Sequence, residues 1–198
     1  MNTTTPTALT SCAQEQVGTV ADLIATAFAS LAVSKWLVAD PEERVAALRA
    51  QFGMIVEHAA EHGTIYLDSG GTAAAVWLDY TRPVPEPADY DRRLLQACGQ
   101  HTPRFAALDG AFEEHHPTTA HHHLAFMAVH PQHQGRGMGG SLLAQHHRVL
   151  DQAAAPAYLE AASLRAARLY RRWGYRFISR IDLPHGPSMW TMWREPRA

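Results

Sequence analysis

Helical spacing of apolar residues is clearest in the first third of the chain. One apolar helix face is predicted over residues 17–30, at Val17, Val20, Leu23, Ile24 and Phe28. A second helix is predicted from Pro41 to about residue 62, because Asp40 is a favoured N-cap and two glutamates follow in the first turn. Gly63 then ends that helix. A third helical region, broken or split in two, is expected over residues 88–114.

Short apolar runs indicate the strands. Residues 64–67 and 73–78 are strand-like, and the sequence Asp-Ser-Gly-Gly between them predicts a hairpin turn. Residues 122–129 form a longer apolar run, which is typical of a central strand covered on both faces. Helices and strands then alternate, with helices expected over residues 139–153 and 164–173 and strands over residues 156–161, 175–182 and 189–193. This order predicts a mixed sheet of the α/β class.

The composition fits one compact domain, which we assign to residues 1–198. Of the 198 residues 46% are hydrophobic and 18% charged, so the chain can bury a sizeable core. No segment approaches the roughly 20 apolar residues of a membrane span, and Met1 to Pro6 show no secretory signal. Cys12 and Cys98 are too few for a disulfide framework. The expected location is therefore the cytoplasm.

Charge is distributed unevenly along the chain. Residues 1–160 carry 9 Lys and Arg against 17 Asp and Glu, whereas residues 161–198 carry 8 Arg against 2 acidic residues. A basic end of this kind can indicate an anion site, a nucleic-acid surface or a solvated helix face. The arginines are not interleaved with aromatic residues in a nucleic-acid-binding signature, so no nucleic-acid partner is expected.

A glycine-rich segment carries the most informative motif. The strand expected to end at Val129 is followed by four glycines between residues 135 and 140, which lead into a helix. Glycine permits positive φ and close backbone approach, and the first amides of a helix attract anions. The segment therefore predicts a site for a phosphate or a pyrophosphate.

Two other phosphate-binding motifs fit this segment less well. A P-loop needs a lysine before its serine or threonine, and here Gly140 precedes Ser141. The dinucleotide fingerprint G-x-G-x-x-G is matched by Gly135, Gly137 and Gly140, but five residues separate the strand from the first glycine. Only about 60 residues remain downstream, too few for the further βα units of a doubly wound domain.

Two motifs in this order resemble the GNAT superfamily of N-acetyltransferases. Gln134-x-x-Gly137-x-Gly139 after the strand is similar to the acetyl-CoA pyrophosphate loop of that superfamily. Leu169-Tyr170-Arg-Arg-Trp-Gly174-Tyr175 is similar to its L-Y-x-x-x-G-[FY] signature. The resemblance implies a GNAT fold: a mixed, mostly antiparallel central sheet of six to seven strands, with helices on both faces and a splayed central strand pair.

Within that superfamily, nearly the whole chain resembles puromycin N-acetyltransferase and its relatives. The segments that carry this resemblance are Ala27-Phe28-Ala29, Gly71-Thr-Ala-Ala-Ala-Val-Trp77, Val129-x-Pro131-x-His133-Gln134, Pro156-Ala157-x-Leu159-Glu160 and Pro184-His-Gly186-Pro187-x-x-Trp190-x-Met192. The resemblance implies transfer of an acetyl group from acetyl-CoA to the amine of a small molecule, with antibiotics of the puromycin type favoured. Acetylation of a protein or peptide amine and a non-catalytic acyl-CoA-binding domain are the alternatives.

The resemblance also implies which residues would bind the donor and do the chemistry. The implied acetyl-CoA-binding residues are Met127, Ala128, Val129, Gln134, Gly135, Arg136, Gly137, Met138, Gly139, Gly140 and Ser141. Acetyl transfer needs a base for the ammonium proton and an acid for the departing thiolate. The motif position implies Tyr170 as the acid, and the alternative is a tyrosine that packs its helix on the sheet.

The base has several candidates. Glu160 lies on a short apolar strand, where burial would raise its pKa and suit it to act as a base or a cation site. An equal alternative for Glu160 is a salt bridge to a nearby arginine. His122 and His123 are alternative bases, because histidine titrates near neutral pH.

The histidine-rich segment and the basic end suggest further partners. The spacing of catalytic zinc sites such as HExxH is absent from residues 115–123, so no metal site is predicted. Some C-terminal arginines are expected to pair with the 3′-phosphate of CoA, from the set Arg165, Arg168, Arg171, Arg172 and Arg176. No membrane partner is expected, and a homodimer is left open.

Overall fold

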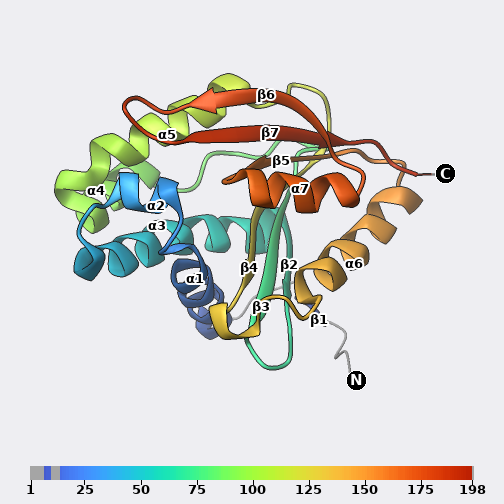
Figure 1. Ribbon diagram of the computed structural model, residues 1–198, viewed down its shortest axis with the longest axis horizontal. Coiled ribbons are helices and arrows are strands. Elements are labelled where there is room, and N and C mark those ends of the chain that lie inside the picture. Colours follow the sequence, from blue (N-terminus) through green and yellow to red (C-terminus); the bar gives the residue numbers. More distant parts are fainter. Residues whose placement is uncertain (1–6, 10–13, 198) are drawn as a thin grey trace.

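The computed structural model describes residues 7–9 and 14–197, which form a seven-stranded sheet with helices on both faces (Figure 1). The sheet order is β1-β2-β3-β4-β5-β7-β6. The strands are β1 (Thr7–Leu9), β2 (Gly63–Leu67), β3 (Ala73–Asp79), β4 (His122–Val129), β5 (Ala157–Ala161), β6 (Arg176–Asp182) and β7 (Ser188–Arg194). All neighbouring pairs are antiparallel except β4 and β5, which are parallel. The predicted fold class is confirmed.

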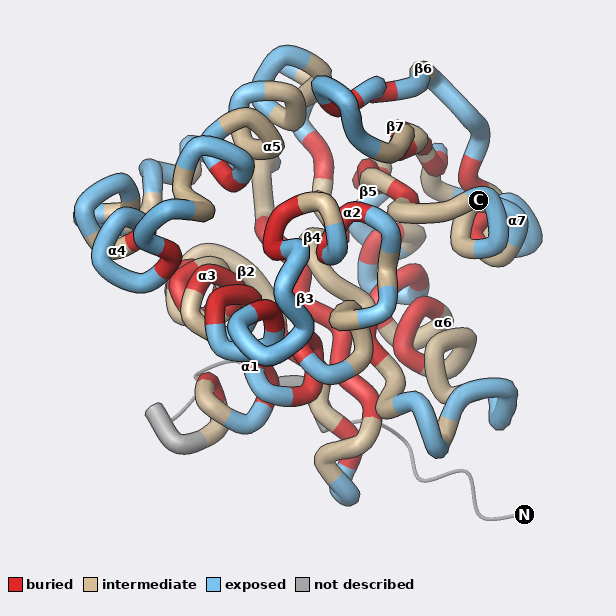
Figure 2. Tube along the Cα trace, turned by 60° about the vertical axis from the view of Figure 1, so that its left-hand side comes forward, coloured by how far each residue is buried: buried red, intermediate tan, exposed pale blue. Residues whose placement is uncertain are grey.

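Each face of the sheet has its own apolar core. On one face pack α1 (Gln14–Phe28), α2 (Ala32–Leu37), α3 (Pro41–His62), α4 (Tyr90–Cys98) and α5 (Thr102–His115), and on the other α6 (Met138–Gln152) and α7 (Leu164–Arg172). Strand β3 is buried on both sides, since Val76 and Leu78 join the core under α1–α5 while Ala75 and Trp77 join the core under α6 and α7. Figure 2 shows this buried strand in the middle of the molecule. We call these the α1–α5 face and the α6–α7 face.

Local sequence accounts for most of the element boundaries. The Asp40 carboxylate accepts a hydrogen bond of 2.8 Å from the Glu42 amide and caps α3. The hairpin turn between β2 and β3 is held by Asp68, whose carboxylate accepts hydrogen bonds of 2.6 Å from the amides of Thr72 and Ala73. At Gly63 a Cβ atom would lie 1.8 Å from the Trp77 carbonyl oxygen, so only glycine allows this approach of β2 to β3.

Two local expectations were wrong. No helix was predicted over residues 32–37, where α2 lies; at six residues it is too short to show helical periodicity. Strand β4 was expected to be covered on both faces, but only Leu124 and Ala128 are buried and its other residues are partly exposed. Its neighbour β5 runs alongside only the beginning of β4.

The parallel pairing of β4 and β5 is short. It consists of His122 with Ala157 and His123 with Tyr158, and it ends there although both strands continue. On its other edge β4 stays paired with β3 along its whole length, with one irregularity at Val76/Trp77. This is the predicted splayed pair, and the rest of the β4 edge towards β5 is left without a strand partner.

Short 3₁₀ turns, η1 (Gly99–His101) and η2 (Pro131–His133), complete the described structure. None of the described helices has the length and apolar character needed to cross a membrane. Cys98 is a buried free thiol, and Cys12 and the segment Met1 to Pro6 lie outside the described residues.

Candidate active site

The predicted glycine loop connects the end of β4 to the beginning of α6. The loop is tied to the sheet by the Gln134 side chain, whose Nε2 donates a 3.1 Å hydrogen bond to the Val129 carbonyl. The Arg136 guanidinium donates to the Gln132 carbonyl at 3.2 Å and stabilises the same turn. Most of the loop is exposed, so its backbone is open to a ligand.

The four glycines have two different roles. Gly135 and Gly137 adopt positive φ, at 79° and 84°, which side chains other than glycine rarely adopt. Gly139 and Gly140 are helical and allow close packing instead. A Cβ atom on Gly140 would lie 2.9 Å from the Trp173 ring, and one on Gly139 would lie 3.5 Å from Met127 Cε.

The backbone amides at the start of α6 fit an anionic group. The first helical bond of α6 runs from the Ser141 amide to the Gly137 carbonyl at 3.1 Å. For the amides from Gly135 to Gly140, the described part of the chain offers no hydrogen-bond acceptor. With Met138 as the first helical residue and no acidic side chain in the first turn, the positive end of the helix dipole is uncompensated.

The predicted donor-binding residues on β4 point in two directions. Met127 and Val129 pack with the α6–α7 core and contact the helix start at Gly139. Ala128 points to the α1–α5 core and is 1% exposed. The structure therefore brings the side chains of Met127 and Val129 beside the loop, while Ala128 can offer only its backbone there.

Tyr170 lies near the end of α7, on the α6–α7 face. Its ring packs 5.7 Å from the ring of Tyr175, and burial raises the pKa of its hydroxyl well above the usual range. No hydrogen bond of the Tyr170 hydroxyl is found among the described residues, and the residue is 8% exposed. The hydroxyl therefore keeps its proton near neutral pH.

Glu160 and His123 form a buried pair where β4 and β5 separate. His123 Nε2 lies 2.8 Å from Glu160 Oε2, and the two side chains are 12% and 5% exposed. Both alternate along their strands with residues of the α6–α7 core, so they project towards the α1–α5 face, opposite to Tyr170. The structure thus unites two of the predicted base candidates in one unit.

The charge state of Glu160 differs from the expectation. Burial alone would raise its pKa, but the adjacent His123, together with Tyr158 and His116 nearby, outweighs burial and lowers it. The alternative of a salt bridge to an arginine is also wrong, because the partner of Glu160 is His123. His122 points elsewhere, with its Nδ1 3.3 Å from His146 Nε2.

Three further residues surround the Glu160–His123 pair: His116 and His121, which belong to the histidine-rich segment weighed above for metal binding, and Tyr80, which was not singled out from the sequence. The rings of Tyr80, His116 and His121 lie within 6.2 Å of one another or of His123, measured between centroids. A histidine-rich segment before a strand was visible, but nothing in the sequence could place Tyr80 beside it. Among the described residues no group of three histidine, cysteine or acidic side chains is arranged to hold a metal ion.

Comparison with known proteins agrees with this geometry. Residues 92–177 match the model of the acetyltransferase (GNAT) domain. The chain is similar to an acetyltransferase from Corynebacterium glutamicum, described as histone acetyltransferase HPA2 and related acetyltransferase, at 28% identity and a TM-score of 0.71, covering 98% of both chains. The protein is an N-acetyltransferase with the GNAT fold.

More distant structures share the fold alone. A GCN5-related N-acetyltransferase from Rhodopseudomonas palustris is 15% identical, with a TM-score of 0.59 and 98% of both chains covered. A mosquito arylalkylamine N-acetyltransferase-like protein is 11% identical, with a TM-score of 0.55 over 96% of this chain and 99% of the other. GNAT acetyltransferases generally use acetyl-CoA as the donor.

Proposed function

We propose that this N-acetyltransferase transfers the acetyl group of acetyl-CoA to the amine of a small molecule, and that residues 1–198 act as a single domain. When bound, acetyl-CoA would supply the acetyl group as an activated thioester. The unpaired amides between Gln134 and Ser141 would hold its pyrophosphate, and Met127 to Val129 would line its path along the unpaired edge of β4.

The buried Glu160–His123 pair carries this proposal. A glycine loop alone would also suit a protein that only binds acyl-CoA. A transferase needs in addition a group that removes the proton of an ammonium acceptor, and an ionised carboxylate paired with histidine can do so. The pair lies where the strands separate and on the face opposite to Tyr170.

Tyr170 is the proposed proton donor to the departing thiolate. The raised pKa of its hydroxyl keeps the proton in place until the sulfur arrives, and no hydrogen bond to a described side chain competes for it. The acid would then act from the α6–α7 face and the base from the α1–α5 face, with the acetyl group between them.

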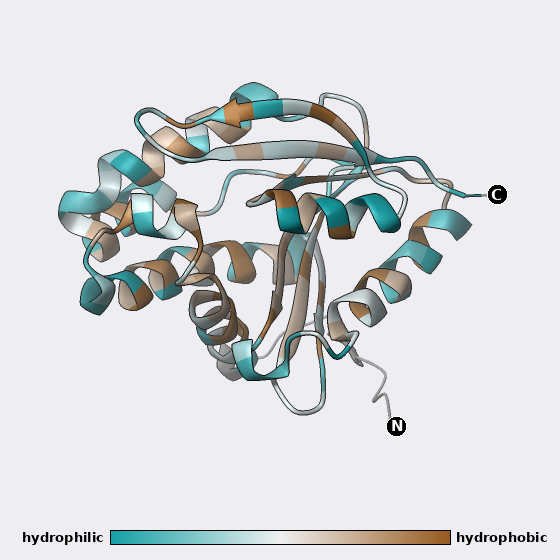
Figure 3. Cartoon of the chain, in the orientation of Figure 1, coloured by the Kyte–Doolittle hydropathy of each residue, from teal (hydrophilic) through white to brown (hydrophobic). Residues whose placement is uncertain are grey.

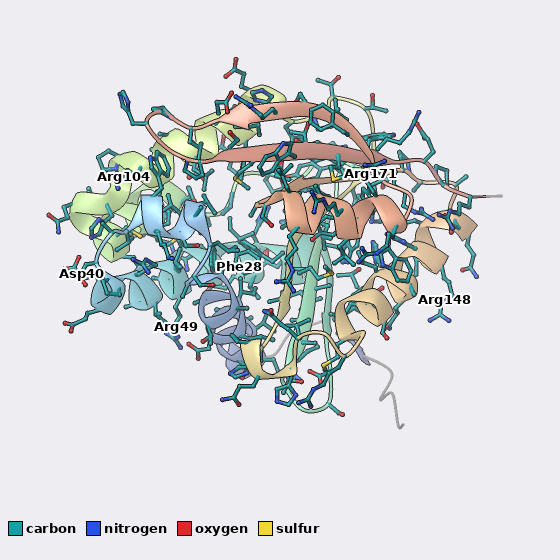
Figure 4. The ribbon with its side chains drawn as sticks, in the orientation of Figure 1. Phe28, Asp40, Arg49, Arg104, Arg148 and Arg171 are labelled. Atoms are coloured by element: carbon teal, nitrogen blue, oxygen red, sulfur yellow. The ribbon has the colours of Figure 1, made fainter. Side chains whose placement is uncertain are left out.

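A contact over the α1–α5 face supports a small acceptor. The Trp36 indole on α2 donates a 3.1 Å hydrogen bond to the Pro184 carbonyl in the β6–β7 turn, and Arg104 of α5 donates to the Trp36 carbonyl. A Cβ atom on Gly186 would lie 2.6 Å from the Trp36 indole nitrogen, so this approach requires glycine. Figure 4 shows Arg104 and Phe28 on this side of the molecule. An extended peptide would need these segments to be apart.

Thiol release from acetyl-CoA tests the proposal. We would assay the full chain with puromycin, with primary alkyl and arylalkyl amines and with a lysine-containing peptide, the alternative acceptor suggested by the description of the Corynebacterium structure. The expected result is acetylation of a small amine, confirmed by product mass, with kcat/KM at least tenfold above that of the peptide. A higher kcat/KM for the peptide would contradict the acceptor class. Tight CoA binding without turnover of any amine would contradict the transferase assignment.

A further inference from the structure

Strand β4 contains one residue without a counterpart in its neighbour β3. Phe126 of β4 lies opposite Val76. Leu124 lies opposite Trp77, so Ala125 is left over between them. An extra residue of this kind is a β-bulge, which interrupts the ladder and changes the direction of the side chains that follow it. The bulge lies just beyond the short pairing that joins β4 to β5.

The bulge turns Phe126 towards the α1–α5 face. Leu124 belongs to the α6–α7 core, so strict alternation would place Phe126 in that core as well. Phe126 packs against the α1–α5 core instead, and Met127 then returns to the α6–α7 side. The Phe126 ring therefore lies on the face to which His123 and Glu160 project. With the extra residue discounted, it is two strand positions beyond His123, roughly 7 Å along β4.

The Phe126 ring belongs to a group of three. Its centroid lies 4.7 Å from that of Phe52 on α3 and 6.0 Å from that of Phe28 at the end of α1. The centroids of Phe28 and Phe52 are 5.7 Å apart. Centroid distances of about 4.5 to 7 Å are those at which aromatic rings attract one another. We call these three rings the phenylalanine triad, and Figure 4 shows Phe28 between α1 and the central strands.

Two rings of the triad are not fully buried by the fold. Phe52 is 7% exposed and belongs to the α1–α5 core, whereas Phe28 and Phe126 pack against that core and stay partly exposed. Among the described residues no cation lies over a ring of the triad; the Arg104 guanidinium lies over Trp36 instead. The triad therefore offers apolar ring surface on the face of the proposed base. Another aromatic ring can pack on such a surface edge to face or with an offset.

We propose that the acceptor is an amine that carries an aromatic ring, and that Phe126 and Phe28 select it by packing against this ring. The inference rests on the proposed function and names the class of small amine within it. The amine nitrogen would lie at the Glu160–His123 pair and the ring at the triad. A separation of roughly 7 Å along β4 corresponds to a spacer of about two or three carbon atoms between nitrogen and ring.

The selectivity of the wild-type enzyme is the first test. We would measure kcat/KM of the full chain for butylamine, phenethylamine and cyclohexylethylamine by thiol release from acetyl-CoA. We expect phenethylamine to exceed butylamine by about tenfold or more and cyclohexylethylamine by about threefold, because the saturated ring has the bulk but not the charge distribution of an aromatic ring. Equal values for the aromatic and the saturated ring would overturn the proposal.

The length of the spacer is the second test. In the series from benzylamine to phenylbutylamine, kcat/KM should pass through a maximum at phenethylamine or phenylpropylamine, since only these reach from the Glu160–His123 pair to the triad. A value that does not depend on the spacer, or that is highest for benzylamine, would overturn the placement of the ring.

Variants of the triad assign the selectivity to its residues. Phe126→Leu and Phe28→Leu should each reduce the preference for phenethylamine over butylamine by about three- to tenfold. Phe112→Leu is the matched control, because Phe112 on α5 also packs against the α1–α5 core but lies outside the triad. Its preference should equal that of wild type. Thermal unfolding of all three variants shows whether they are folded, and an equal loss of preference in the control would overturn the role of the triad.

A readout that needs no turnover completes the test. In a crystal structure of the full chain with CoA and N-acetylphenethylamine, the centroid of the bound ring should lie within about 7 Å of that of Phe126 or Phe28. A ring bound elsewhere would overturn the inference even in an active enzyme. If wild type acetylates butylamine and phenethylamine equally well, this inference fails and the proposed function stands. If wild type acetylates no amine, the proposed function itself is contradicted.

Discussion

The glycine loop presents backbone groups, whereas the Glu160–His123 cluster presents side chains. The loop offers unpaired backbone amides, is mostly exposed, and lies within one continuous segment of eight residues. The cluster works through side chains, is buried, and is assembled from β4, β5, the end of α5 and the residue after β3. A ligand common to a whole superfamily can be held by backbone, which varies little with sequence. Proton transfer needs individual side chains at defined positions.

We expect the largest loss of acetyl-CoA affinity when a negative charge is placed beside the backbone amides of the loop. Gly137 has φ of 84° and open space around it, and Asp and Asn tolerate this conformation better than other residues. We expect Gly137→Asp to weaken acetyl-CoA binding by about a hundredfold, because a carboxylate would face the pyrophosphate at the helix start. Gly137→Asn, which has the same shape and strain, should lose less than about tenfold. Isothermal titration with CoA measures both.

Equal losses in the two Gly137 variants would mean that conformation rather than charge controls the loop. In that case the loop would still differ from the cluster in using backbone amides, but the attraction between the helix start and an anion would not explain its affinity. Unchanged affinity in both variants would contradict the assignment of the loop to the donor.

Two neighbouring tyrosines test whether the cofactor side also depends on an individual side chain. No described residue forms a hydrogen bond with the Tyr170 hydroxyl, whereas the Tyr175 hydroxyl lies 3.2 Å from His147 Nε2. We expect Tyr170→Phe to lower kcat by about ten- to a hundredfold at an unchanged unfolding temperature. Tyr175→Phe should lower stability by about 1 kcal/mol and leave kcat unchanged. Steady-state kinetics and thermal unfolding of both variants test this difference. An unchanged kcat in Tyr170→Phe together with a lowered kcat in Tyr175→Phe would remove Tyr170 as the acid.

Sequence analysis succeeded wherever the signal was local. The N-cap at Asp40, the hairpin turn at Asp68 and the glycine loop are each specified by residues within one turn of the chain. The end of α7 at Gly174, with φ of 92°, is of the same kind. The missed helix α2 is short, and its place depends on a contact 148 residues away, between Trp36 and Pro184.

In the candidate site, too, the part formed by neighbouring residues could be predicted and the part formed by distant residues could not. The glycine loop that we propose to bind the donor could be predicted because its residues follow one another in sequence. The partner of Glu160 could not, because His123 reaches it through the parallel pairing of β4 with β5. The predicted direction of the Glu160 pKa was wrong for this reason: burial was foreseen, but the neighbour that outweighs it was not.

Buried histidines predict an acid-sensitive fold. Burial lowers the pKa of His146 to about 2 and that of His147 to about 4, so the folded state keeps both rings neutral where the unfolded chain, with an ordinary value near 6.5, binds protons. The unfolded state therefore gains stability as the pH falls below about 6.5. Each such histidine should lower the free energy of unfolding by up to about 1.4 kcal/mol per pH unit, until its folded-state pKa is reached.

Urea unfolding between pH 7.5 and pH 5 measures this slope. His147→Asn should reduce it by about one proton, although it also lowers stability at every pH. His185→Asn is the control, since His185 is exposed and has a positive φ of 51° that asparagine accepts. A slope unchanged by His147→Asn would show that His147 is protonated in the folded state.

The smallest effect concerns the arginines of α7, the one set of side chains expected to help the loop. The helix is strongly hydrophilic (Figure 3), and Arg165, Arg168, Arg171 and Arg172 are exposed without a carboxylate partner among the described residues. The end of α7 is near the loop, because Trp173 packs against Gly140. If Arg171 and Arg172 meet the 3′-phosphate of CoA, changing both to Gln should raise KM for acetyl-CoA by about two- to fivefold at low salt, as expected for exposed ion pairs.

The same pair of changes at Arg165 and Arg168 is the matched control and should have less effect. Acetyl-dephospho-CoA should show no difference between the variants. An equal rise for both pairs would indicate a general field of α7 instead of a contact, and the loop would then bind its ligand through backbone alone.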